Sequence, residues 1–297
     1  MNAFQGKVVW ITGASSGIGR ALALAFAAAG ARLILSARRA DALEEVRRAC
    51  GTAEVHLVPL DLADLDSLPG RATEALACYE SVDIMVHNAG LAARARVVDA
   101  TRDVLELVLR TNYVGPAILT RALLPSMLAR GGGQFVVISS LSGKYGGPLL
   151  SAYAASKHAL HGFFESLRAE EHDRGIVVTF VVPGFIKTDI TAHALTGRGA
   201  RFGRVLPIFR TAMEPEECAR RILPAVARRR PEVLVGGAEL WTVRLQRWFP
   251  RALAVVVRSH PVRIRNRLLG WIPFLGRRWR EHPLERKRHD SEIDDNS

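Results

Sequence analysis

A tyrosine and a lysine lie four positions apart in the segment 151–162, which reads SAYAASKHALHG. The segment contains several alanines and no proline, so it predicts a helix on which Tyr153 and Lys157 share one face. An ammonium group beside a phenol stabilises the phenolate and lowers its pKa from ~10 toward the working range. Such a tyrosine can donate and accept protons in catalysis. The same spacing also arises by chance on solvated helix faces, so the assignment depends on the surrounding motifs.

A glycine-rich loop lies between the first predicted strand and the first predicted helix. Gly13 permits a tight turn, Gly17 lets the backbone approach a pyrophosphate, and Gly19 allows close packing of helix on strand. Free N–H groups at the start of the helix favour a bound anion. In this strand–loop–helix setting the loop predicts nucleotide binding. The expected cofactor contacts in the loop are Gly13, Ser15, Ser16, Gly17, Ile18 and Gly19.

The residues after the second predicted strand favour NADP(H) over NAD(H). A free ribose 2′-hydroxyl usually meets an acidic side chain at this position, but the sequence reads Ser36-Ala37-Arg38-Arg39. A guanidinium suits a 2′-phosphate, so we expect Arg38 to bind one; alternatively, both arginines are solvated surface charges. Asp61 directly follows the third predicted strand, where it contacts an adenine ring, caps the next helix, or does both.

Apolar runs of strand length alternate with longer helical segments between residues 7 and 235. Strands buried on both faces appear as continuous apolar runs, and strands that alternate with helices form a parallel, doubly wound sheet with right-handed crossovers. We therefore predict an α/β, Rossmann-like fold with about seven strands. The predicted strands are 7–12, 32–36, 54–59, 83–87, 134–139, 176–182 and 232–235, and the predicted helices are 20–29, 41–50, 64–80, 101–129, 151–174 and 214–229.

The motifs together resemble those of the short-chain dehydrogenase/reductase family over roughly residues 5–236. The likeness depends on their order and spacing along the chain rather than on any single motif. The motifs are Thr12-Gly-Ala-Ser-Ser-Gly-Ile-Gly19, Asp61-Leu62, His87-Asn-Ala-Gly90, Asn112, Ile138-Ser-Ser140, Tyr153-x-x-x-Lys157 and Pro183-Gly184.

This resemblance implies a role for each matching residue. Tyr153 would be the general acid in reduction and the general base in oxidation, and Lys157 would lower its pKa and bind the nicotinamide ribose. Ser140 would donate to the substrate carbonyl, with Ser139 and Ser142 as rivals, and Asn112 would hold a water that links Lys157 to solvent or simply mark a kinked helix. The further implied cofactor contacts are Leu62, Asn88, Ala89, Gly90, Pro183, Gly184, Ile186 and Thr188.

Two segments qualify the resemblance. His87 occupies a position where the family often has asparagine, and we interpret it as a packed histidine at a strand end rather than a catalyst. In this family residues 189–213 cover the substrate, and here they carry apolar residues such as Leu195 and Phe202 among four arginines. This composition favours a lipophilic substrate with a polar end, although a mobile loop rich in glycine and arginine would have the same composition.

The positive charge of the chain is concentrated toward its C-terminus. The net charge is +12, and residues 198–288 hold 22 of the 41 basic but only 7 of the 29 acidic residues. We predict a catalytic NADP-binding domain at 1–238, a basic helical extension rich in Trp and Arg at 239–281, and a disordered tail at 282–297. Trp241 and Trp248 share a helical face of the extension, which favours a membrane surface, a dimer interface or packing on the protein's own body. We also expect a homo-oligomer.

Composition limits the remaining possibilities. Three cysteines with no C-x-x-C pairing argue against a disulfide framework or zinc site, and no other metal-binding spacing occurs. The first predicted strand starts so close to Met1 that no signal peptide fits, and no apolar run is long enough to span a membrane. We therefore expect a cytoplasmic protein, at most peripheral to a membrane. A near-neutral body without a recognised nucleic-acid-binding fold argues against nucleic acid as a partner.

Two classes of function fit these observations. The first is an NADP(H)-dependent oxidoreductase that interconverts a small-molecule ketone or aldehyde and an alcohol. The second is a non-catalytic NADP-binding scaffold at a membrane surface, which would need neither Ser140 nor the Tyr153–Lys157 pair. An epimerase or dehydratase of nucleotide sugars is disfavoured by the spacing of the glycines.

Overall fold

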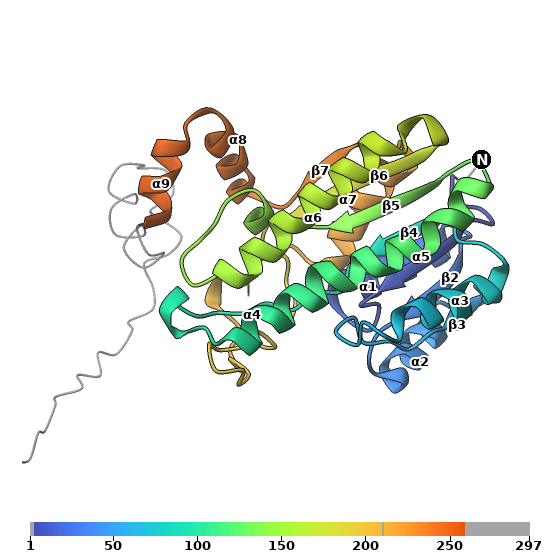
Figure 1. Ribbon diagram of the computed structural model, residues 1–297, viewed down its shortest axis with the longest axis horizontal. Helices are drawn as coiled ribbons and strands as arrows, with labels where there is room; N and C mark the ends of the chain where they lie inside the picture. Colours follow the sequence, from blue (N-terminus) through green and yellow to red (C-terminus); the bar gives the residue numbers. More distant parts are fainter. Residues whose placement is uncertain (1–2, 210, 259–297) are drawn as a thin grey trace, which may run out of the picture. The chain divides into compact units, whose positions relative to one another are not determined.

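The computed structural model describes residues 3–209 and 211–258. One parallel sheet holds seven strands in the order β3-β2-β1-β4-β5-β6-β7 (Figure 1), which confirms the predicted Rossmann-like fold. The strands are β1 Val8–Thr12, β2 Arg32–Ser36, β3 Val55–Leu57, β4 Ile84–His87, β5 Gly133–Ile138, β6 Ile176–Pro183 and β7 Glu232–Val235. The helices are α1 Gly17–Ala28, α2 Ala40–Ala49, α3 Leu68–Tyr79, α4 Arg102–Leu109, α5 Gly115–Ala129, α6 Ser151–Glu170, α7 Pro215–Ala227, α8 Trp241–Trp248 and α9 Pro250–Arg258.

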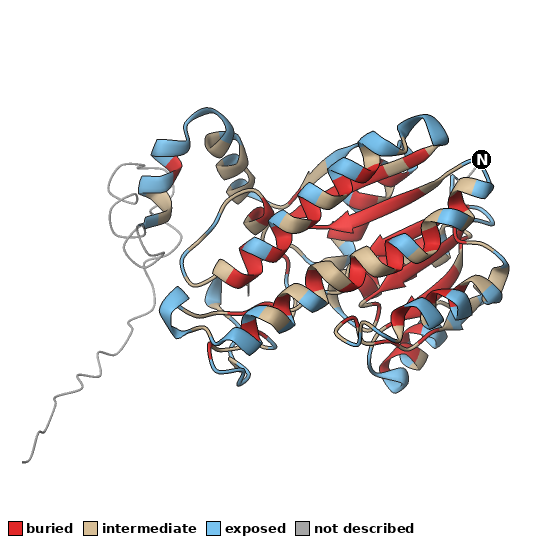
Figure 2. Cartoon of the chain, in the orientation of Figure 1, coloured by how far each residue is buried: buried red, intermediate tan, exposed pale blue. Residues whose placement is uncertain are grey.

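Two apolar layers cover the two faces of the sheet. Side chains alternate between the faces along each strand, so Val9 and Ile11 of β1 pack with α1, α2 and α7, whereas Val8 and Trp10 pack with α3, α5 and α6. The central strands β1, β2, β4, β5 and β6 consist almost entirely of buried residues (Figure 2), whereas the edge strands β3 and β7 are partly exposed. Burial on both faces explains why the strands appear in the sequence as continuous apolar runs.

The order of the strands reverses between β1 and β4, which lie side by side with Ile11 opposite Val86. In open parallel sheets, ligands bind outside the carboxyl ends of the strands at such a reversal. The glycine loop leaves β1 at this point, and the loop from Asn88 onward leaves β4 there. The fold therefore brings together two segments that lie far apart in the sequence.

Two predicted helices differ from those observed. The helix expected at 64–80 begins only at Leu68, because Asp61 accepts a hydrogen bond from the backbone N–H of Ala63 (2.9 Å) in a turn that delays the helix. The long helix expected at 101–129 is divided into α4 and α5 by a π-helical segment, Arg110–Val114. Such π-helical turns are rare and often lie at functional sites; this one contains Asn112.

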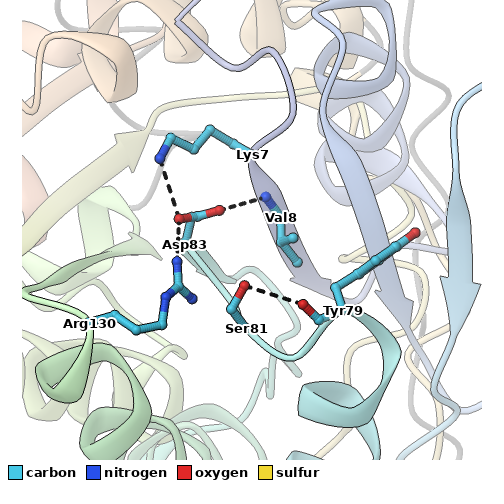
Figure 3. Close-up of polar contacts among 6 residues, drawn as sticks. All are labelled: Lys7, Val8, Tyr79, Ser81, Asp83 and Arg130. Atoms are coloured by element: carbon cyan, nitrogen blue, oxygen red, sulfur yellow. Dashed lines mark hydrogen bonds and ion pairs between the residues drawn. The ribbon is translucent and has the colours of Figure 1, made fainter.

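Residues at the amino ends of β1, β4 and β5 meet at Asp83 (Figure 3). Its carboxylate accepts a hydrogen bond from the backbone N–H of Val8 (2.9 Å) and forms ion pairs with Lys7 (3.4 Å) and Arg130 (2.9 Å). A cavity of about 300 Å³ lies against the same residues. Since these residues precede or begin their strands, the cavity lies at the amino edge and is not the nucleotide site.

One compact unit extends through Leu253, and a second begins at Ala254. Helix α8 and the turn before it belong to the first unit: Tyr145 Oη lies 2.9 Å from Thr242 Oγ1 of α8, and Glu239 Oε1 of the turn accepts from the N–H of Phe185 (2.8 Å). The predicted boundary after residue 238 and the extension as a separate part stay predictions. The predicted tail at 282–297 lies outside the described residues. Within the described residues, no helix is both long and apolar enough to cross a membrane.

Candidate active site

Helix α6 presents Tyr153 and Lys157 to the carboxyl end of β5. The Lys157 ammonium donates a 2.8 Å hydrogen bond to the carbonyl of Ile138, the last residue of the strand. Ser140 lies two residues beyond, and its side chain is a hydrogen-bond partner of Tyr153. The structure therefore places three of the sequence-predicted catalytic residues, Ser140, Tyr153 and Lys157, in one contact between a helix and a strand end.

Tyr153 is almost completely enclosed, with 9% of its surface exposed. It packs against Ala92 and Ala194 in a small apolar cluster bordered by Ile190 and Phe202. Burial raises the pKa of Tyr153 to about 12, and the hydrogen bond with Ser140 acts in the opposite direction. This differs from the expected lowering, because removal of the phenolate from water outweighs its favourable interactions in the cofactor-free protein.

Lys157 is also buried, with 3% of its surface exposed. Burial lowers the pKa of its ammonium group to about 8, since a charged amine is poorly solvated there. Its Nζ lies 5.7 Å from the centroid of the Tyr153 ring, and its hydrogen bond to Ile138 keeps it in place. A Cβ added to Gly90 would lie 3.6 Å from Lys157 Nζ, which is ordinary van der Waals distance, so Gly90 lies directly beside the amine.

Asn112 lies in the π-helical segment and is buried. Its Oδ1 accepts from the N–H of Leu91 (2.7 Å), and its Nδ2 donates to the Leu91 carbonyl (2.8 Å) and to Ser156 Oγ (2.9 Å). The amide therefore joins the loop after β4 to helix α6, and its protein contacts satisfy it. Its proposed link to Lys157 through a water stays a prediction.

The glycine loop is closed against the loop after β4. Asn88 Nδ2 donates to the carbonyls of Thr12 (2.9 Å) and Gly13 (3.1 Å). Gly13 has a φ of +66°, and an added Cβ would lie 2.7 Å from Ala89 Cα, so this turn requires glycine. Ser16 makes no side-chain cap to helix α1, which leaves the N–H groups at the helix start available to an anion. This cradle fits the pyrophosphate of a dinucleotide.

The ends of β2 and β3 would lie along the adenosine half of such a ligand. Ser36, the last residue of β2, is buried and bonds Trp10 Nε1 (2.8 Å) and the Val58 carbonyl (2.6 Å). Arg38 follows it on the exposed surface, and none of the ion pairs formed among the described residues involves it. Asp61 does not cap helix α3, which begins at Leu68 after Ser67; its carboxylate instead accepts from the Ala63 N–H in the preceding turn, and Leu62 beside it is buried. Its expected contact with an adenine ring stays a prediction.

The loop after β6 borders the glycine loop from the other side. A Cβ added to Gly17 would lie 3.0 Å from Thr188 Cγ2, so the two loops are neighbours. Ile186 is buried beneath them and pairs with Met213. The remaining cofactor residues expected here are Pro183 at the end of β6 and Gly184 directly after it.

Two histidines, His87 and His161, are packed near the site. The sequence motifs indicated no role for His161. His87 Nε2 lies 2.8 Å from Thr120 Oγ1 between aromatic rings, as a packed strand-end residue. His161 Nε2 lies 2.9 Å from Ser139 Oγ, and its ring stacks on Phe180 at 4.2 Å. His161 follows Lys157 by one helical turn, and that spacing was the available signal. No cluster suited to a metal ion occurs within residues 3–209 and 211–258.

The family model for short chain dehydrogenases matches residues 7–198. The chain belongs to the short-chain dehydrogenase family. As a member of this family it is an oxidoreductase with a small-molecule substrate, and its Rossmann-like sheet and its glycine loop agree with that assignment.

Relatives and solved structures of the short-chain dehydrogenase family match most of the chain. The dehydrogenase/reductase SDR family protein 7-like of Drosophila melanogaster is 44% identical over 244 residues, covering 80% of this chain and 75% of that protein. The dehydrogenase/reductase SDR family member 7B of Bos taurus is 44% identical over 239 residues, covering 78% and 74%. A family member from Burkholderia phymatum in complex with NAD has a TM-score of 0.75 at 26% identity, covering 85% of this chain and 96% of its own. A metagenomic short-chain oxidoreductase in complex with NADP has a TM-score of 0.65 at 29% identity, covering 78% and 98%.

Proposed function

We propose that the chain is an NADP(H)-dependent oxidoreductase that interconverts a ketone or aldehyde and the corresponding alcohol on a lipophilic substrate. The observation that carries this proposal is the enclosed Tyr153, which lies between Ser140 and Lys157 at the carboxyl edge of the sheet. A nucleotide-binding scaffold would need the glycine loop but not this buried phenol and amine. Burial of an ammonium group without an acidic partner is unfavourable, so the presence of buried Lys157 beside Tyr153 favours catalysis over a scaffold.

The side chains of the site can donate the proton that a carbonyl reduction requires. When bound, the nicotinamide cofactor supplies or accepts the hydride. The Tyr153 hydroxyl is protonated near neutral pH, because its pKa lies at about 12, and is therefore suited to donate its proton to the carbonyl oxygen. The Ser140 hydroxyl orients that oxygen. The positive charge on Lys157 stabilises the phenolate that remains after transfer.

The charge at the end of β2 supports NADP(H) rather than NAD(H). Solved relatives bind either cofactor, so the preference depends on this chain's own residues. Ser36 is fully used in buried hydrogen bonds, and no acidic side chain lies between it and Asp41, in the first turn of α2, to accept from a ribose 2′-hydroxyl. The exposed guanidinium of Arg38 is free to bind a 2′-phosphate.

Apolar side chains around Tyr153 support a lipophilic substrate. Tyr153 forms one cluster with Ala92 and Ala194, and Ile190 and Phe202 pack against that cluster; binding sites for apolar ligands are lined mostly by such side chains, with a few orienting polar groups. NADPH oxidation measured against ketones and aldehydes of increasing chain length tests this function, with Tyr153→Phe as the control. Turnover that rises with chain length and depends on Tyr153 is expected. Tight NADPH binding without turnover of any carbonyl would favour the scaffold.

We also propose that helix α8 contacts a membrane surface. Trp248 and Phe249 are 70% and 65% exposed, and Arg247 lies over the Trp248 ring at 5.8 Å. Large exposed aromatic residues beside arginine are typical of segments that lie in a membrane interface. Co-sedimentation with anionic liposomes should be lost when Trp248 and Phe249 are both replaced by serine. Unchanged co-sedimentation would contradict this contact. The expected homo-oligomer stays a prediction.

A further inference from the structure

Arg94 lies beside the apolar cluster that encloses Tyr153. Its backbone N–H donates to the carbonyl of Leu195 (2.7 Å), which fixes the loop after β4 against the segment that follows β6. Its guanidinium carbon lies 5.8 Å from the centroid of the Phe202 ring. The backbone hydrogen bond holds the Arg94 main chain, and the Phe202 ring holds the guanidinium by a cation–π contact. Both ends of the residue therefore have a defined position.

The neighbours of Arg94 are also the neighbours of Tyr153. Ala92, two residues before Arg94, packs directly against the phenol together with Ala194. Phe202, which contacts the guanidinium, borders the same cluster, and its N–H donates to the Ala194 carbonyl (2.7 Å). A substrate whose carbonyl meets Tyr153 would therefore extend along Phe202 toward Arg94.

The charge of Arg94 has no acidic partner among the described residues. The next arginines along the chain do have one: Arg96 pairs with Asp99 (3.9 Å) and Arg102 with Glu106 (2.5 Å). Arg94 is more buried than either, and burial lowers its pKa from the ordinary value. A partly buried cation without a counterion is unfavourable by itself, and a bound anion would relieve that cost through charge-assisted hydrogen bonds.

We propose that Arg94 binds an anionic group on the substrate, a carboxylate or a phosphate, at the end of an apolar chain whose carbonyl lies at Tyr153. The inference rests on the proposed function and narrows its substrate class to acidic oxo compounds. Phe202 contributes an apolar face for the chain, and the guanidinium supplies paired N–H donors for the oxyanion.

The activity test compares long-chain ketones that differ only at one end, which bears a carboxylate, a phosphate monoester or a neutral methyl ester. The wild-type enzyme should prefer an acidic substrate in kcat/KM. Arg94→Met should lower that kcat/KM by about 10- to 100-fold, which corresponds to the loss of hydrogen bonds to a charged group, and the loss should fall mainly on KM. For the methyl ester, kcat/KM should fall far less in Arg94→Met. Arg94→Lys, which keeps a positive charge, should restore part of the preference for the acidic substrate. The matched control is Arg96→Met, which removes an exposed arginine two residues away. It should leave kcat/KM for both the acidic substrate and the methyl ester unchanged.

A binding measurement makes the test independent of turnover. Calorimetry would compare a fatty acid with the alcohol of equal chain length on the wild-type protein, Arg94→Met and Arg96→Met, with thermal melting to confirm folding. Binding of the acid should be tighter than that of the alcohol and should fall selectively in Arg94→Met. Equal affinities, or equal losses for acid and alcohol, would overturn the anion site. A wild-type enzyme that reduces the neutral ketone but shows no acid preference would leave the proposed function intact while refuting the role of Arg94.

Discussion

Ser139 Oγ and His161 Nε2 lie 2.9 Å apart in the buried contact between the end of β5 and helix α6. Gly143 makes this contact possible, since an added Cβ would lie 3.2 Å from the His161 ring and closer still to Ser139 Oγ. Stacking on Phe180 fixes the ring from behind. His161 therefore anchors the residue directly before Ser140.

Residues on three successive turns of α6 bind three successive residues at the end of β5. Lys157 binds the carbonyl of Ile138, His161 binds Ser139, and Tyr153 interacts with Ser140. Loss of the His161 contact should let Ser140 move. Misplacement by as little as ~1 Å can lower catalysis up to about 100-fold.

We expect His161→Phe to lower kcat by between about 10- and 100-fold while NADPH affinity stays close to the wild-type value. His161→Gln keeps a polar partner for Ser139 and should recover part of the rate. His158→Ala, an exposed position on the same helix, serves as the control. Steady-state kinetics with thermal melting measure these effects. A loss of stability with unchanged kcat would show that the contact is purely structural.

The Lys157 amine should reduce the stability of the folded chain. Burial lowers its pKa from 10.5 to about 8. Near neutral pH, keeping Lys157 protonated in the folded state therefore reduces the free energy of unfolding by roughly 3 kcal/mol. Between pH 8 and 10.5 the unfolded state binds more protons, and stability therefore rises with pH across this window.

Replacement of Lys157 by methionine should therefore stabilise the cofactor-free protein near neutral pH, by about 1–3 kcal/mol once the lost hydrogen bond to Ile138 is allowed for. The same variant should lose NADPH-dependent turnover. Urea unfolding of the variant and the wild type measures the difference in free energy of unfolding. The measurement is made near neutral pH and again above the usual lysine pKa, where the difference should be smaller. A variant that is less stable than wild type near neutral pH would contradict the cost assigned to the amine.

Arg38→Ala should weaken NADPH binding by about 10- to 100-fold, because charge-assisted hydrogen bonds to the 2′-phosphate are lost. NADH binding should stay nearly unchanged, since no 2′-phosphate is present. Arg48→Ala removes an arginine that pairs with Glu44 on helix α2 (3.1 Å) and serves as the control. Fluorescence titration of both cofactors measures the affinities. Equal losses for NADPH and NADH would refute the role of Arg38.

Asp83 should stabilise the sheet in a pH-dependent manner. Burial raises the pKa of its carboxyl, but the Val8 N–H and the positive charges of Lys7 and Arg130 outweigh that effect, so the pKa is lowered overall (Figure 3). The stabilisation is present above the unfolded pKa and is lost as pH falls through the folded pKa. Asp83→Asn should be about 1–3 kcal/mol less stable near neutral pH, and the difference should shrink below about pH 4. Urea unfolding across this pH range measures the difference in free energy of unfolding between Asp83→Asn and the wild type. A difference that does not change with pH would contradict the ionic contribution of Asp83.

Features built from local patterns were predictable from the sequence. Apolar runs indicated the central strands because β1, β2, β4, β5 and β6 are buried on both faces, and the glycine spacing indicated the turn at Gly13 because that turn requires a positive φ. The pairing of Tyr153 with Lys157 on one helix face followed from helical spacing, and the surrounding motifs indicated that the pair belongs to the site. In each case, the physical cause lies within a few residues.

Features that depend on contacts between distant segments were not predictable. A kink at Asn112 was one of the two interpretations of the sequence, but the bonds of its amide to Leu91 and Ser156, which belong to other segments, could not be inferred from local spacing. The raised pKa of Tyr153 depends on burial by Ala92 and Ala194, which no spacing around the tyrosine reveals. The contact between Ser139 and His161 likewise joins a strand end to a helix.

The central claim is that Tyr153 transfers the proton during an NADPH-dependent carbonyl reduction. It is tested most directly by single-turnover transfer of deuterium from NADPH, labelled at nicotinamide C4, to a long-chain ketone. The wild-type enzyme should place deuterium on the alcohol carbon. Tyr153→Phe should bind NADPH with unchanged affinity but transfer deuterium about 10²- to 10⁴-fold more slowly. Transfer by Tyr153→Phe at the wild-type rate, or tight NADPH binding by the wild-type protein without transfer to any ketone, would contradict the account.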